Sequence, residues 1–220
     1  MTAAAIPQPL ARAIAQAGLD PIGGFALTKD DGFPDIYKSL ILLGPSASDF
    51  WPIFKDSPEA QDGLPDPIDR WSTRVCTALA AASDARALFP FGATPALPFI
   101  SWALRTGQIH VSAAQLLIHP RAGLWVSFRA ALLIRDAIDF GPPAPSPCDS
   151  CATRPCLSAC PVAAINAGGY DVPSCHAHLD QPAGAACMHA GCLVRQSCPI
   201  SQSFGRLPAQ SAHHMRYFHP

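Results

Sequence analysis

The sequence predicts an α/β (α+β) domain followed by a small cysteine-rich module. Over residues 1–140, apolar runs of strand length are interspersed with segments of helical periodicity. Eight of the nine cysteines then gather between Cys148 and Cys198. Residues 141–147, which are rich in proline, are expected to form an extended linker, so that residues 148–220 make up the module.

The first domain is expected to contain both helices and strands. Apolar residues at helical spacing, with Pro or Gly near the ends, predict helices at Pro9–Ala17, Pro67–Ala87 and Pro95–Arg105. Apolar or alternating runs predict strands at Ile22–Leu27, Lys38–Leu43, Val111–Ile118 and Leu124–Ile134. The continuous run of the second strand indicates a central position, covered on both faces. A turn is expected at His119–Gly123, and a short helix at Ala209–His219.

The cysteine spacing is typical of an iron–sulfur protein. Cys148, Cys151, Cys156 and Cys160 are separated by two, four and three residues, and Pro161 follows the last of them. The bacterial two-cluster pattern has two, two and three residues, so Arg154 and Pro155 are extra. A second set ends in the same Cys-Pro pair and consists of Cys175, Cys187, Cys192 and Cys198. Eight thiolates match two 4Fe–4S clusters in a ferredoxin-like module.

The ligands are expected to cross between the two sets. In the bacterial pattern, the cysteine before proline binds the other cluster. One cluster is therefore assigned to Cys148, Cys151, Cys156 and Cys198, and the other to Cys160, Cys175, Cys187 and Cys192. The ninth cysteine, Cys76, lies in a predicted helix and is expected to be a small buried apolar residue.

Other uses of the cysteines and other partners are less favoured. Structural zinc fits the number of thiolates, but zinc sites usually combine two CxxC pairs, and here only Cys148 and Cys151 form one. Disulfides need an oxidising compartment, whereas no signal peptide is recognised and a cytoplasmic protein is expected. A net charge of −1 gives no reason to expect nucleic acid as a partner, and no apolar run is long enough to span a membrane.

The chain resembles a known family. The stretches Lys38–Gly44 and His119–Arg129 (HPRAGLWVSFR), together with the two cysteine sets, resemble the epoxyqueuosine reductases. The first domain also resembles the related vitamin B12 processing proteins, which remove upper ligands from cobalamin. This resemblance implies a nitroreductase-like mixed sheet with helices that binds cobalamin in the base-off form, beside a ferredoxin module that supplies single electrons. The polar residues expected near such a cofactor, each of which has a structural role as its alternative, are His110, His119, Ser127 and Arg129.

One departure from the family affects the expected reaction. The reductases carry an acidic proton donor just before the helix that we place at Pro95, and the matching position here is Gly92. We therefore do not expect epoxyqueuosine reduction, and no catalytic residue is assigned. Two hypotheses remain: an oxidoreductase that reduces or processes a corrinoid, and an electron-transfer protein that serves another redox partner and has no catalysis of its own. Uptake of a corrinoid or a flavin would distinguish them.

Overall fold

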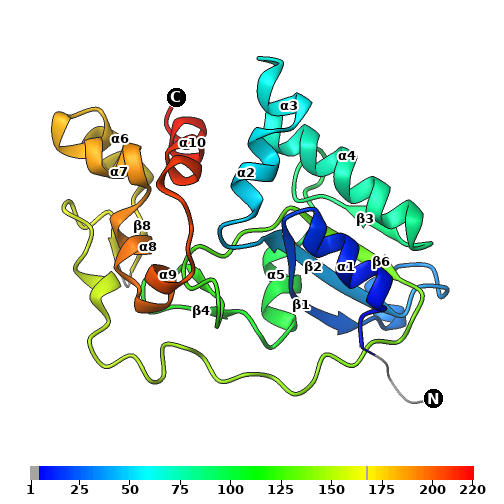
Figure 1. Cartoon of the computed structure of the whole chain (residues 1–220). Coiled ribbons are helices and arrows are strands. Elements are labelled where there is room, and N and C mark those ends of the chain that lie inside the picture. Colours follow the sequence, from blue (N-terminus) through cyan, green and yellow to red (C-terminus); the bar gives the residue numbers. More distant parts are fainter. Residues whose placement is uncertain (1–4, 167) are drawn as a thin grey trace. The chain divides into compact units, whose positions relative to one another are not determined.

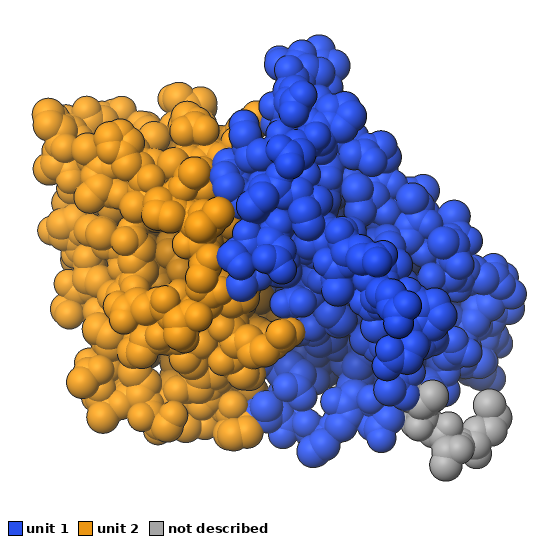
Figure 2. Space-filling view, in the orientation of Figure 1, with its two compact units in different colours: residues 1–108, 127–144 blue, residues 109–126, 145–220 orange. Residues whose placement is uncertain are grey.

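The computed structural model describes residues 5–166 and 168–220 and divides into two compact units (Figures 1 and 2). The first unit comprises Met1–Gln108 and Ser127–Ala144, and the second comprises Ile109–Val126 and Pro145–Pro220. The division differs from the expected one, because residues 109–126 group with the cysteines. The reason is apolar packing, since Ile118 and Leu124 are buried in the same core as Cys156 and Cys198.

The first unit is built on a four-stranded sheet with the strand order β1-β2-β6-β3. Its strands are β1 (Leu19–Ala26), β2 (Ser39–Pro45), β6 (Ala130–Ile134) and β3 (Arg86–Leu88). Every neighbouring pair is antiparallel, so the sheet differs from the mixed sheet that the resemblance implies. Strands β2 and β3 run in the same direction, but β6 lies between them and pairs with both.

The central position of β2 is confirmed. All seven of its residues are buried, and β1 and β6 pair with its two edges. Strand β6 is also buried along its whole length. A strand that is covered on both faces has no solvent side, which explains why its sequence is continuously apolar rather than alternating.

Helices cover this sheet, and Figure 1 shows their arrangement. The helical elements are α1 (Gln8–Gln16), the 3-10 turn η1 (Lys29–Asp31), α2 (Phe50–Lys55), α3 (Pro58–Gln61), α4 (Pro67–Ala82) and α5 (Phe99–Arg105). Helix α1 packs on β1, α4 packs on β3 and β6, and α5 packs on β1. The ring of Trp71 in α4 meets Phe50 of α2 edge to face, with 5.3 Å between the ring centroids. This contact ties α2 to α4 inside the core.

Two predicted helices have different ends in the structure. Helix α4 stops at Ala82 instead of Ala87 because Asp84 adopts a left-handed conformation, with φ of 50°. The chain then enters β3. Helix α5 begins at Phe99 instead of Pro95. A proline disfavours helical geometry in the residue before it, so Pro98 keeps Leu97 out of the helix.

The predicted strands after Gln108 are shorter than expected. Val111–Ile118 forms a small antiparallel pair, β4 (His110–Val111) and β5 (Leu117–Ile118), because Gln115 turns the chain with φ of 58°. Of Leu124–Ile134 only β6 is strand, since the first residues of that stretch pack in the second unit. The turn at His119–Gly123 is confirmed by the paired backbone of its two end residues.

The second unit consists of short elements around a small apolar core. Besides β4 and β5, these are η2 (Pro155–Leu157), β7 (Ile165–Asn166), β8 (Gly169–Tyr170), α6 (Val172–Leu179), η3 (Pro182–Gly184), α7 (Ala185–Ala190), α8 (Leu193–Ser197), α9 (Pro199–Ser203) and α10 (Pro208–Phe218). The helix expected at Ala209–His219 is confirmed as α10. Among the described residues, no helix is long and apolar enough to cross a membrane.

An ion pair between two helices of the first unit generates a prediction about acid stability. The Arg74 guanidinium of α4 binds the Glu59 carboxylate of α3, with 2.9 Å between Nη2 and Oε2. Hydrogen bonding to Arg74 lowers the pKa of Glu59 from its usual 4.5 to about 2. A lowered carboxyl pKa contributes stability that is present above pH 4.5 and is lost as the pH falls towards 2.

We therefore expect Glu59→Gln to lower the unfolding free energy at pH 7 and to flatten its decline below pH 4.5. Urea denaturation at several pH values measures both effects. Asp84→Asn is the control, because the ion pair of Asp84 with Arg135 is exposed and its loss should change little. An unchanged pH profile in Glu59→Gln would contradict the prediction.

Candidate iron–sulfur site

All eight cysteines of the two sets lie in the second unit, on short turns and helix ends. Cys148 and Cys151 stand on the loop before η2, Cys156 is inside η2, and Cys160 follows it. The extra residues Arg154 and Pro155 thus form the start of the 3-10 turn that carries Cys156. The later cysteines occupy α6, α7 and the two ends of α8, and are Cys175, Cys187, Cys192 and Cys198.

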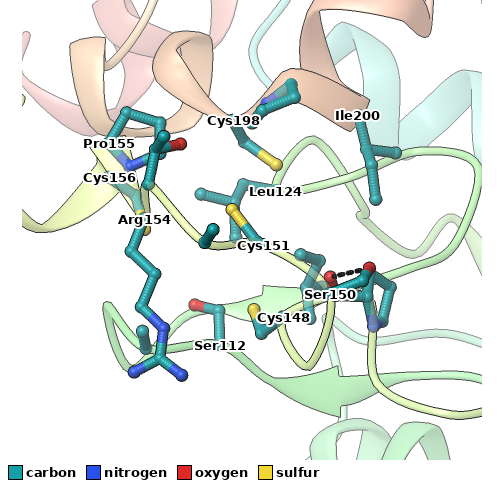
Figure 3. Close-up of a pocket in the computed structure, with 16 residues that line it drawn as sticks. Ser112, Leu124, Cys148, Ser150, Cys151, Arg154, Pro155, Cys156, Cys198 and Ile200 are labelled. Atoms are coloured by element: carbon teal, nitrogen blue, oxygen red, sulfur yellow. Dashed lines mark hydrogen bonds between the residues drawn. The ribbon is translucent and has the colours of Figure 1, made fainter.

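One group of four thiols surrounds a single cavity. Cys148, Cys151, Cys156 and Cys198 line a space of about 300 Å³ (Figure 3). Its other walls are mainly apolar and include Ile118, Leu124, Pro147, Pro155, Pro199 and Ile200. Burial, followed by the three neighbouring thiols, raises the pKa of Cys156. The structure therefore brings Cys198 from the far end of the module to the first cysteines.

The other four thiols form a second group. Burial raises the pKa of Cys187, and the nearby Cys192, Cys175 and Cys160 add to the effect. Burial likewise raises the pKa of Cys175, with Cys192 and Cys160 as neighbouring thiols. Cys160 is thus near the later cysteines. These two groups are the ones that the crossed assignment requires, while ligation of clusters by them stays a prediction.

The Cys-Pro pairs explain how the chain changes direction at Cys198. A residue before proline is held in an extended conformation, and Cys198 has φ of −66° and ψ of 124°. It closes α8 and opens α9, whose first residue is Pro199. Cys192 stands at the other end of α8. The five-residue helix therefore separates one thiol of each group.

The HPRAGLW stretch packs directly on this module. The Ser201 hydroxyl of α9 accepts a hydrogen bond from the Leu124 backbone N–H at 2.8 Å. Gly123 has φ of 56°, and a Cβ at this position would lie 2.5 Å from Ser201, so only glycine fits without displacement. The Arg195 guanidinium of α8 donates to the Leu124 carbonyl, and the Arg206 guanidinium lies over the Trp125 ring.

The four polar residues predicted near a cofactor fall into both units. His119 is buried, and its Nδ1 accepts hydrogen bonds from the backbone N–H groups of Arg121 and Ala122, each at 3.2 Å. Burial lowers the pKa of His119 to about 4, so the ring is neutral and supports its own turn. His110 is in the same unit, and its Nε2 is buried without a hydrogen-bond partner among the described residues.

Ser127 and Arg129 belong to the first unit. Arg129 Nη1 contacts the Asp69 carboxylate at 3.3 Å, and burial lowers the pKa of this arginine and raises that of Asp69. The Ser127 hydroxyl and Arg129 Nε are buried and have no hydrogen-bond partner within the part of the chain that the structure describes. A buried donor without a partner is costly, so both atoms are candidates to contact a ligand.

Sequence reasoning missed three residues that shape the site. Tyr170 donates a hydrogen bond to Cys175, Arg195 lies in α8 between Cys192 and Cys198, and Ser201 binds the backbone of the cavity residue Leu124. Tyr170 and Arg195 lie within five residues of a motif cysteine, and this closeness in sequence could have indicated their role. Nothing in the sequence indicated a role for Ser201, because its partner Leu124 is far from it in the chain.

Comparison with known proteins agrees with this architecture. The chain is similar to a selenomethionine-labelled epoxyqueuosine reductase, with 16% identity and a TM-score of 0.50, over 93% of this chain and 70% of that one. It is also similar to the epoxyqueuosine reductase from Streptococcus thermophilus, with 14% identity and a TM-score of 0.53, over 92% and 68% of the two chains. The chain shares the fold of these reductases. No protein-family model and no curated protein matches the sequence.

The predicted likeness to epoxyqueuosine reductases is therefore confirmed for the fold. The resemblance of the first domain to vitamin B12 processing proteins stays a prediction. The same holds for the ferredoxin-like character of the module. Among the described residues, no three His, Cys, Asp or Glu side chains form a group that could hold a single metal ion.

The grouping of thiols predicts the effect of single cysteine substitutions. Cys160→Ala should damage the same cluster as Cys187→Ala, because both thiols lie in the second group. Cys198→Ala should instead match Cys148→Ala. Electron paramagnetic resonance of the reduced, reconstituted variants measures this. Cys76→Ala is the control, since Cys76 is buried in α4 and should leave the spectrum unchanged. If Cys160→Ala instead resembles Cys148→Ala, the crossed assignment is wrong.

Proposed function

We propose that this protein transfers single electrons through two 4Fe–4S clusters. The observation that carries the proposal is the division of eight thiols into two groups of four, one of which lines a cavity of about 300 Å³. A water molecule occupies roughly 30 Å³ of liquid, so this space can take a group much larger than one ion. Four thiols per group is also the number that one cubane cluster needs.

The residues present suit such a cluster. When bound, a 4Fe–4S cluster accepts and releases one electron at a time. The thiolates of Cys148, Cys151, Cys156 and Cys198 would hold the first cluster. The apolar walls formed by Ile118, Leu124 and Ile200 would limit the access of water, which is one of the factors that set the potential of a cluster. Cys160, Cys175, Cys187 and Cys192 would hold the second.

Iron analysis tests this proposal. We expect about eight irons per chain after anaerobic reconstitution, because each 4Fe–4S cluster uses four thiolates and the eight thiolates would hold two clusters. Cys76→Ala should keep the same iron content. An iron content of about four per chain would leave only one cluster, and a colourless protein that holds zinc would replace the proposal with a structural zinc module.

We further propose that the first unit holds the electron acceptor and that this acceptor is a corrinoid. Two observations support it: the fold shared with epoxyqueuosine reductases, and the buried Ser127 hydroxyl and Arg129 Nε, which have no hydrogen-bond partner in the described part of the chain. Both atoms can donate hydrogen bonds to the amide oxygens at the rim of a corrin ring. In this hypothesis the protein supplies orientation and exclusion of water, and the reaction is a reduction or an upper-ligand removal.

Epoxyqueuosine is not the substrate in this proposal. Gly92 lies in an exposed loop with φ of 74°, and apart from its two chain neighbours no described residue comes within 4 Å of where its Cβ would be. Glycine has no group that could donate a proton to a substrate at this position. The alternative function is a ferredoxin-type electron-transfer protein that binds no corrinoid and delivers its electrons to another protein.

Titration with cob(II)alamin distinguishes the two functions. We expect the anaerobic protein to bind it and to shift its spectrum to that of the base-off form. Ser127→Ala and Arg129→Ala should weaken binding at least tenfold, because each hydrogen bond to a buried group contributes about 1.5 kcal/mol. Arg135→Ala is the control, since Arg135 is half-exposed and forms an exposed ion pair with Asp84. If wild-type protein shows neither a shift nor retention of cobalamin on gel filtration, the ferredoxin-type function is favoured.

A further inference from the structure

Tyr170 donates a hydrogen bond to a cysteine of the second group. Its hydroxyl lies 3.3 Å from Cys175 Sγ. Tyr170 ends β8, and Cys175 lies in the first turns of α6. Between them, the Asp171 side chain caps α6 by accepting a hydrogen bond from the Ser174 backbone N–H at 3.0 Å. The strand end and the capped helix therefore fix the distance between the hydroxyl and the sulfur.

The ring of Tyr170 is also held from another direction. It stacks on Phe218 of α10, with 6.1 Å between the ring centroids and 20° between the planes. The backbone N–H of Asp171 binds the Ala164 carbonyl at 2.7 Å, which ties the end of β8 to the chain before β7. The hydroxyl is thus placed by packing and by backbone hydrogen bonds, not only by its contact with Cys175.

Arg195 brings a positive charge to the same group. It lies in α8, which begins directly after Cys192. Its guanidinium donates a hydrogen bond to the Leu124 carbonyl. The Cys192 thiol and the Tyr170 hydroxyl lie close enough to interact electrostatically with this guanidinium. No carboxylate lies within ion-pair distance of this guanidinium in the described parts of the chain. A partly buried cation without a carboxylate favours added negative charge nearby.

We propose that Tyr170, together with Arg195, raises the reduction potential of the cluster held by Cys160, Cys175, Cys187 and Cys192. This inference rests on the proposed iron–sulfur function. Reduction adds one electron to a cluster that is already anionic through its thiolates. Hydrogen bonds to the sulfurs and nearby positive charge stabilise that added electron. The first group differs in its hydrogen bonding, because the described residues that line its cavity include the cation Arg154 but no tyrosine. Tyr170 and Arg195 therefore act on the cluster through its ligands and surroundings.

The test is a potentiometric titration of wild-type protein and Tyr170→Phe, followed by electron paramagnetic resonance. The second cluster is identified as the signal that Cys187→Ala loses. At a fixed potential, Tyr170→Phe should lower the ratio of reduced to oxidised second cluster threefold to tenfold, where tenfold corresponds to about 59 mV for one electron. Arg195→Met should shift the same cluster in the same direction. The first cluster should keep its potential in Tyr170→Phe and serves as the internal reference.

Tyr217→Phe is the matched control, because Tyr217 is an exposed residue of α10 and should change neither potential. Phenylalanine keeps the stacking on Phe218, so Tyr170→Phe should retain its iron. If it holds eight irons and the potential of its second cluster is unchanged, the inference is overturned. If the wild-type protein does not bind about eight irons, the proposed function fails instead.

Discussion

The second unit depends on the return of Cys198 to the cavity lined by Cys148, Cys151 and Cys156. The extended conformation that Pro199 imposes on Cys198 makes this return possible, because α8 ends there and α9 starts in a new direction. The same short helix places Cys192 with the other thiols. A break in α8 would therefore disturb both groups at once, which distinguishes this module from one with two independent knuckles.

Elements whose burial is uniform could be predicted from the sequence. Strand β2 was recognisable because a strand covered on both faces is continuously apolar. The stretch Leu124–Ile134 was misread because its alternating residues serve two different cores. Leu124 is buried with the cysteines, whereas Ala130–Ile134 lies in the sheet. Local periodicity carries no information about which core a residue joins, so the unit boundary at Val126 could not be found this way.

The cysteine groups were predictable, whereas their surroundings were not. The Cys-Pro pairs already indicate crossing between the two sets. The polar residues were chosen only because the chain resembles a family that binds cobalamin. Of these, His119 has its Nδ1 occupied by its own turn, while the Ser127 hydroxyl and Arg129 Nε have no hydrogen-bond partner among the described residues. The positions of the Tyr170 hydroxyl and the Arg195 guanidinium depend on β8 and α8, and the spacing of residues in the sequence does not predict them.

The HPRAGLW stretch can be understood from packing alone. Its histidine accepts two backbone hydrogen bonds within the turn, and its glycine allows the close approach of Ser201. Leu124 then enters the wall of the cavity, while its backbone N–H and carbonyl are bound by Ser201 and Arg195. Both backbone groups of one cavity residue are thus satisfied by the helices α8 and α9 that flank Cys198. A substitution of Gly123 would therefore act first on the cavity of the first group, although this residue lies far from every cysteine in the sequence.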